Sequence, residues 1–328
     1  MEIYKESDAK RQQVLTESGT NEVEIIEFYL GDQSFGINVS KVREIVSYDP
    51  GKVTGIPEAH FSVMGMLLLR DTTIPLVDLK KHMAIQSTIV QDSRPVVLVC
   101  EFNKIVNAFL VDGVHQIHRC SWNDISPLSP FLSYYKPGIT SSITIGGVNI
   151  LMVDLEHIMV DIYPETKLVY SEKDVENHTL DIAKRHHERE ETHILFAEDS
   201  PIVRASVKKV TDQAGYNNLL IFDNGLDAYQ EIASLAEKAK REGKPIGEYI
   251  TALLTDIEMP KMDGLTLCRK VKEDLRLTNL PVIIFSSLIN DQMINKCRSV
   301  GADGWAGKLQ VEELIHVLDQ FCVENPGK

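Results

Sequence analysis

The sequence lacks the features that mark secreted and membrane proteins. It holds 5 cysteines in 328 residues, an odd number that argues against a disulfide framework, and no two have the C-x-x-C spacing of a zinc or redox motif. No apolar run approaches the roughly 18 residues of a membrane span. The polar start, residues 1–5, lacks the apolar stretch of a signal peptide. We therefore predict a reduced, cytoplasmic protein without direct membrane insertion.

Clusters of basic residues are also missing. Lys and Arg number 34 against 48 Asp and Glu, a formal net charge of −14, which repels the phosphates of nucleic acids. The densest basic stretch, residues 184–189, is followed by two glutamates, which is typical of a mixed-sign solvated helix. Its two adjacent histidines would point about 100° apart on a helix, so they are a poor pair of ligands for one metal ion. Nucleic acid is therefore excluded as a partner. The length favours two domains, and 43% hydrophobic residues are typical of a folded chain.

Residues 25–155 consist of short apolar stretches broken by Gly, Pro and Asp, which is typical of an all-β domain. Gly146-Gly147 between two apolar triplets predicts a type I′ hairpin. The i, i+3, i+4 spacing of Val42, Ile45 and Val46 predicts one short helix. Val-Asp-Leu occurs at residues 77–79 and again at 153–155, which indicates either a duplicated pair of small barrels or a chance similarity between two buried strands.

The texture of the sequence changes near residue 165. Residues 163–192 are polar and charged, and we interpret them as a linker with some helix. Beyond the linker, continuous apolar runs alternate with amphipathic segments, which predicts strands buried on both faces of a parallel, doubly wound sheet. These runs lie at residues 194–197, 219–222, 252–254 and 282–285, with a short fifth strand near 305–307. A polar stretch at residues 231–248 predicts a long helix between the second and third strands.

Charged and polar side chains follow these strands. Glu198 and Asp199 follow the first, Asp256 the third, Ser286 the fourth and Lys308 the fifth. Such groups meet at the carboxyl edge of a parallel sheet. Because three neighbouring carboxylates repel one another unless a cation shares them, the cluster predicts a Mg²⁺ site. The set suits phosphoryl transfer to a carboxylate, with Asp256 as the nucleophile. The alternative is a cluster that serves only capping and solubility.

These residues resemble a response-regulator receiver domain, of flavodoxin-like fold, over about residues 193–325. The resemblance rests on residues 197–200, 256–264, 281–286 and 301–303, and on Lys308. It implies that Glu198, Asp199, Asp256 and the backbone carbonyl of Glu258 bind Mg²⁺. It further implies that Asp256 accepts phosphate, Ser286 is the switch hydroxyl, Trp305 is the switch aromatic residue and Lys308 bonds the phosphoryl group. Leu309 replaces the proline that usually follows this lysine. The family's cis peptide at this bond depends on that proline, so the resemblance does not carry the cis peptide over to this chain. Glu258 stands where haloacid-dehalogenase-type phosphatases have a second catalytic aspartate, which counts against that class.

The first half resembles a CheW-type chemotaxis coupling domain over about residues 22–162. The motifs lie at residues 35–45, 63–70, 74–79 and 112–114, with Asp71 where the family commonly has glycine. The resemblance implies paired five-stranded barrels that bind the CheA-type histidine kinase and the tips of chemoreceptors. By position, Arg70 would face the receptor, and Val42 and Glu44 would contact partners. The alternatives are an exposed hairpin arginine at position 70 and a core role for Val42.

A coupling domain followed by a receiver is the arrangement of the CheV-type family. The predicted divisions are an N-terminal tail at 1–21, the coupling domain at 22–162, the linker at 163–192 and the receiver at 193–325. The resemblance implies a non-enzymatic adaptor at cytoplasmic arrays of methyl-accepting chemoreceptors, regulated by Mg²⁺-dependent phosphorylation of Asp256. Two alternatives remain open: a phosphate sink for the kinase, with the coupling domain as a tether, and a Mg²⁺-dependent aspartyl phosphatase.

Overall fold

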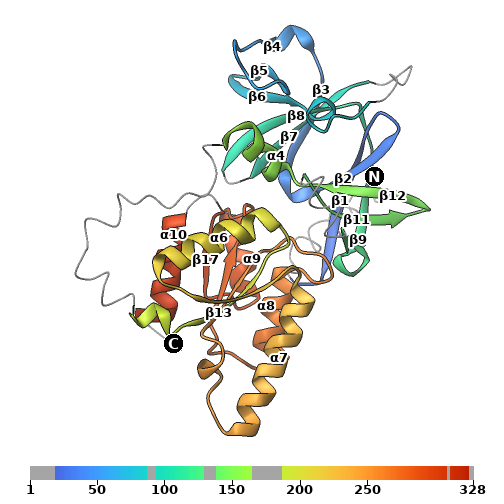
Figure 1. Ribbon diagram of the computed structural model, residues 1–328. Helices are drawn as coiled ribbons and strands as arrows, with labels where there is room; N and C mark the ends of the chain where they lie inside the picture. The colour runs from blue at the N-terminus through green and yellow to red at the C-terminus, as the bar shows by residue number, and fades with distance from the viewer. Residues whose placement is uncertain are drawn as a thin grey trace. The chain divides into compact units, whose positions relative to one another are not determined.

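The computed structural model describes residues 19–86, 94–102, 104–128, 138–164, 187–308 and 311–324. The chain forms two compact units. One comprises residues 22–167, and the other comprises residues 168–328 together with residues 1–21. Figure 1 shows both units, which we describe separately. Most of the predicted linker (residues 165–186) and Leu309, with its predicted peptide geometry, lie outside the described residues.

The described part of the first unit holds two β-sheets, each with five longer strands and one two-residue strand at an edge. The first sheet runs in the order β10 (Ser126–Pro127), β11 (Ile139–Ile145), β12 (Val148–Val153), β2 (Gln33–Asn38), β1 (Glu22–Leu30), β9 (Gly113–Ser121). The second runs in the order β3 (Val42–Ser47), β7 (Val96–Phe102), β8 (Ile105–Val111), β6 (Thr72–Asp78), β5 (Val63–Leu69), β4 (Val53–Thr54). The predicted all-β domain built from two similar halves is confirmed.

The repeated Val-Asp-Leu tripeptide marks the same turn in both sheets. β6 and β12 each pair in parallel with a neighbour, β8 and β2 respectively, and each leads into a helix. Asp78 caps α2 (Leu79–His82) by accepting a hydrogen bond from Lys81 N at 2.9 Å, and Asp154 caps α4 (Leu155–Ile162) by accepting one from His157 N at 3.0 Å. The repeat is therefore structural, and chance similarity is the weaker explanation.

Two local predictions in this unit had opposite outcomes. The hairpin between β11 and β12 is confirmed, because Gly146 and Gly147 have φ values of 58° and 85°. The helix predicted from Val42, Ile45 and Val46 is wrong, because residues 42–47 form strand β3, antiparallel to β7. Burial alternates along β3, and Ile45 is 42% exposed. Pairing with β7 and the β-branched side chains outweigh the helical spacing.

The second unit is an α/β domain with a five-stranded parallel sheet. The strand order is β14 (Asn218–Phe222), β13 (His193–Ala197), β15 (Ala252–Thr255), β16 (Val282–Phe285), β17 (Gly304–Ala306). One apolar core joins the sheet to α6 (Pro201–Ala214) and α10 (Val311–Asp319), and a second joins it to α7 (Gly225–Glu242), α8 (Gly264–Glu273) and α9 (Asp291–Ser299). The doubly wound sheet is thus confirmed. Among the described helices, none is both long and apolar enough to cross a membrane.

Helix α7 begins and ends earlier than residues 231–248, so the predicted bounds are wrong. Asn224 caps its start by accepting a hydrogen bond from Asp227 N at 2.9 Å. Gly243, in the left-handed conformation with φ 67°, ends it, and residues Ile246–Glu248 form a separate 3₁₀ turn. A glycine relieves the strain of that conformation, so it stops the helix before the polar pattern ends.

Candidate functional site

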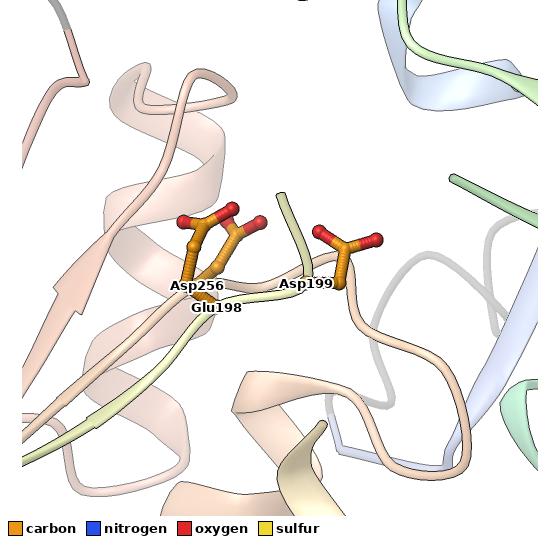
Figure 2. Close-up of side chains that lie close together, drawn as sticks. All are labelled: Glu198, Asp199 and Asp256. Atoms are coloured by element: carbon orange, nitrogen blue, oxygen red, sulfur yellow. The ribbon is translucent and has the colours of Figure 1, made fainter. Parts of the chain in front are cut away.

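Three carboxylates meet at the carboxyl edge of the parallel sheet. Glu198 and Asp199 follow β13, and Asp256 follows the adjacent strand β15. One carboxylate oxygen from each lies within 4.8 Å of the other two, and Figure 2 shows the three side chains on the same side of this edge. Glu198 and Asp256 are 0% and 2% exposed, whereas Asp199 is partly exposed. The structure thus brings together the three side chains that were predicted as magnesium ligands.

Lys308 extends from the end of β17 to the two buried carboxylates. Its Nζ donates hydrogen bonds to Glu198 Oε1 at 3.0 Å and to Asp256 Oδ2 at 2.8 Å, and its side chain is 8% exposed. Three ionised carboxylates and one ammonium have a formal charge of 1 − 3 = −2. A divalent cation of hard character matches both this charge and the oxygen ligands. The residues present therefore fit Mg²⁺.

The electrostatics of Glu198 explain why a cation suits this site. Burial raises the pKa of Glu198 well above its usual value, because the charged form is desolvated. The charges of Asp256 and Asp199 raise this pKa further, and Lys308 opposes both effects. Without a cation the charged form of Glu198 is therefore disfavoured, and a bound divalent cation would offset this cost.

The backbone beneath the carboxylates is held by contacts that the sequence analysis missed. Arg204, on α6, donates from one guanidinium nitrogen to the carbonyl oxygens of Glu198 and Asp199, both at 2.7 Å. A Cβ atom added at Gly264 would lie 1.8 Å from the carbonyl oxygen of Asp256. Position 264 belongs to a motif in the sequence, but only the structure shows that the loop after Asp256 excludes any side chain there. No spacing pattern could have revealed the Arg204 contacts.

The remaining predicted receiver residues lie on or beside the neighbouring strands. Ser286 is fully buried at the end of β16, where its amide donates to Ala306 O at 3.1 Å and its Oγ accepts from Leu288 N at 3.4 Å. Trp305, in β17, is partly exposed, with the guanidinium of Arg298 4.9 Å from its ring centroid. Glu258 lies two residues beyond Asp256 and is partly exposed. The switch and ligand roles of these residues stay predictions.

A residue from the predicted N-terminal tail also holds the loop that follows Asp256. Asn21 belongs to the receiver unit, where its Nδ2 donates to Lys261 O at 3.2 Å and its Oδ1 accepts from Asp263 N at 3.0 Å. Lys261 lies between Asp256 and α8 and has φ 66°. The sequence offers no signal for this contact, because Asn21 is more than two hundred residues from its partners.

The predicted partner-binding residues of the first unit include one exposed ion pair. Arg70 lies in the turn between β5 and β6, its side chain is 76% exposed, and its Nη2 lies 2.9 Å from Glu44 Oε2. Arg70 itself takes the left-handed conformation, with φ 55°, at the turn that Asp71 continues. Val42 is half-buried and packs against the core. Arg70 and Glu44 thus form one surface feature, whereas Val42 serves packing; their partner roles stay predictions.

Comparison with known proteins agrees with this architecture. Residues 24–162 match the CheW-like domain family, and residues 194–319 match the response regulator receiver domain family. Chemotaxis protein CheV3 of Helicobacter pylori is 28% identical over 316 residues, which covers 93% of this chain and 96% of the relative. Chemotaxis protein CheW of Rhizobium meliloti is 31% identical over 136 residues, 41% of this chain and 86% of the relative. Among solved structures, the scaffolding protein TtCheW from Thermoanaerobacter tengcongensis has 24% identity and a TM-score of 0.38, covering 42% of this chain and 86% of that one.

The protein is thus a β-sheet coupling domain joined to a receiver domain. The chain belongs to the CheW-like family of chemotaxis proteins, in the CheV-type arrangement in which a receiver follows the coupling domain.

Proposed function

We propose that this protein is a non-enzymatic chemotaxis adaptor regulated by phosphorylation of Asp256. Its CheW-like domain would join chemoreceptors to a CheA-type histidine kinase at cytoplasmic receptor arrays, as the domain's family membership suggests. The observation that carries the regulatory half is the buried contact of Lys308 with both Glu198 and Asp256. A site used only for capping would not bury two carboxylates and a lysine together.

The side chains around Asp256 support the proposed transfer of a phosphoryl group to it. Bound to Glu198, Asp199, Asp256 and the Glu258 carbonyl, Mg²⁺ would supply positive charge for the phosphoryl oxygens. Ile257 N donates to Asp256 Oδ1 at 2.6 Å, which orients the carboxylate. The Asp256 oxygen attacks phosphorus, the N–P bond of the kinase phosphohistidine breaks, and the released imidazole takes up a proton. Lys308 then stabilises the acyl phosphate, and Ser286 supplies a hydroxyl to it.

The test is phosphotransfer from a radiolabelled, autophosphorylated CheA-type kinase, with and without Mg²⁺. We expect Mg²⁺-dependent label on the wild-type chain, none on Asp256→Asn, and unchanged label on Asp212→Asn. Asp212 is a suitable control because it lies on α6 in an exposed pair with Lys208. Absence of label on the wild type with cognate kinases would refute the regulatory proposal and leave a constitutive scaffold.

The coupling half is tested with receptors, kinase and this protein together. We expect Arg70→Glu to reduce receptor-dependent kinase activity and Glu44→Arg combined with Arg70→Glu to restore part of it, because the 2.9 Å pair would be re-formed in reverse. A phosphate sink would instead take label quickly without any change in the affinity of the complex. Steady hydrolysis of a small phosphomonoester, lost in Asp256→Asn, would support the phosphatase alternative and contradict the adaptor.

A further inference from the structure

Three histidines and an aspartate lie together in the coupling domain, away from the site described above. His60 precedes β5, His82 ends α2, and His157 and Asp161 lie on α4. The side chains of His82 and His157 are 11% and 6% exposed, whereas that of Asp161 is 49% exposed. The group is thus largely buried but open to solvent on the side of the carboxylate.

The distances within this cluster are too long for hydrogen bonds. Asp161 Oδ2 lies 3.6 Å from His157 Nε2 and 3.9 Å from His82 Nε2. His157 is 7% exposed, and neither of its ring nitrogens has a hydrogen-bond partner. A buried imidazole without such a partner is costly, so this arrangement needs an explanation. Ligand atoms around one tetrahedral zinc ion are about 3.3 Å apart, slightly less than the two distances from Asp161.

A buried serine orients two of the rings. Ser62 is fully buried, and its Oγ lies 2.8 Å from His60 Nδ1 and 3.2 Å from His82 Nδ1. Nε2 of each ring is therefore the nitrogen available as a ligand, and the two ring centroids are 5.9 Å apart. Metal-bound histidines typically have their second nitrogen hydrogen-bonded in this way.

The surroundings of His82 favour the neutral form of its ring. Burial lowers the pKa of His82, opposed by the charge of Asp161, while His60 and His157 lower it further. A neutral imidazole is the form that binds metal. A Ser-His-Asp hydrolase is a poor explanation of the same residues, because fully buried Ser62 offers no nucleophile to a substrate.

We propose that His60, His82, His157 and Asp161 bind one divalent transition-metal ion of the zinc class. Three imidazoles and one carboxylate are a suitable tetrahedral set for such an ion. Closing the site requires side-chain rotation, because among the described residues only the acidic group of the receiver already has three ligand atoms within 4.8 Å of one another. The bound ion would tie α4 to α2 and to the loop before β5.

The test uses the full chain, stripped with a chelator and then held in excess Mg²⁺ so that the acidic receiver site is occupied. Co²⁺ is titrated and its absorption between about 500 and 650 nm recorded, and Zn²⁺ affinity is measured by competition with a chromophoric chelator. We expect one equivalent of Co²⁺ with the intense bands of tetrahedral coordination, displaced by Zn²⁺. We also expect Zn²⁺ to raise the thermal midpoint of the wild-type chain.

Two sets of variants identify the ligands. His82→Gln/His157→Gln should weaken Zn²⁺ binding at least tenfold and abolish the tetrahedral Co²⁺ bands. His115→Gln/His118→Gln should change neither, because those rings already contact Glu27 at 2.9 and 2.7 Å. Far-UV circular dichroism checks that each variant is folded, and Asp161→Asn, at an exposed position, provides a second test if the double variant unfolds. Octahedral Co²⁺ spectra, or equal Zn²⁺ affinity in the Asp161 variant and the wild type, would overturn the proposal whatever the outcome of the phosphotransfer assay.

Discussion

Replacing Lys308 with methionine should separate the role of charge at the receiver site from the role of packing. The substitution keeps most of the side-chain volume but leaves Glu198 and Asp256, at 0% and 2% exposure, without their ammonium partner. Removing one member of a buried ion pair typically costs about 3–5 kcal/mol, because the remaining charge stays desolvated. We expect a loss of this size in the free energy of unfolding of the receiver in Mg²⁺-free buffer.

Magnesium should reverse part of this loss. A ligand that binds only the folded state at 100 times its dissociation constant adds about 2.7 kcal/mol of stability. Because Mg²⁺ would also take over the charge compensation lost with the lysine, we expect its stabilising effect to be larger in Lys308→Met than in the wild type. Adding Glu198→Gln to the variant should recover stability without Mg²⁺, since one of the two buried charges is then absent.

Urea unfolding can report the receiver alone. The chain has two tryptophans, one in each unit, so a Trp122→Phe background leaves Trp305 as the fluorescent probe of the receiver. Lys208→Met is the matched control, because Lys208 pairs with Asp212 at 3.0 Å on the exposed surface of α6 and should cost below about 0.5 kcal/mol. The reasoning fails if Lys308→Met and Lys208→Met unfold at the same urea concentration in Mg²⁺-free buffer.

Three further predictions concern single positions. Burial raises the pKa of Glu27, but hydrogen bonds with His115, His118 and Ser34 lower it to about 2, so the stability that these contacts supply is present above about pH 4.5 and lost as the pH falls toward about 2. In the Glu27→Gln variant, the free energy of unfolding of the coupling domain, measured by urea titration, should therefore depend less steeply on pH. A pH dependence equal to that of the wild type would contradict this. Gly264→Ala should abolish phosphotransfer to Asp256 or prevent folding, whereas Gly247→Ala, with no atom within 4 Å of the added Cβ, should behave like the wild type. Asn21→Gly keeps the backbone free to adopt φ 60° but loses two hydrogen bonds, so the Trp305 probe should report a receiver less stable by about 1–2 kcal/mol, and no change would show that Asn21 does not hold the loop.

The carboxyl edge of the parallel sheet could be predicted because its geometry follows from periodicity. Continuous apolar runs locate the strands, and any residue that follows such a run lies at one edge of the sheet. Glu198, Asp199, Asp256 and Lys308 all obey this rule, so their proximity required no knowledge of side-chain contacts. The helix predicted at residues 42–46 was wrong because Val42 and Val46 also fit the two-residue period of a strand, and pairing with β7 selects the strand and leaves Ile45 exposed.

Contacts between distant segments follow no such rule. Asn21 donates a hydrogen bond to the loop after Asp256, and Arg204 donates to the carbonyl groups of Glu198 and Asp199. His60 and His82 are linked through Ser62, whose hydroxyl contacts both rings. Each depends on how turns and helix ends are placed, which local spacing does not encode. The cluster of His60, His82 and His157 could accordingly not be predicted, because these residues are far apart in the sequence. The adjacent pair His186 and His187 was the stronger sequence signal. The four candidate ligands therefore come together only in the folded chain, and two of them, His157 and Asp161, lie on α4.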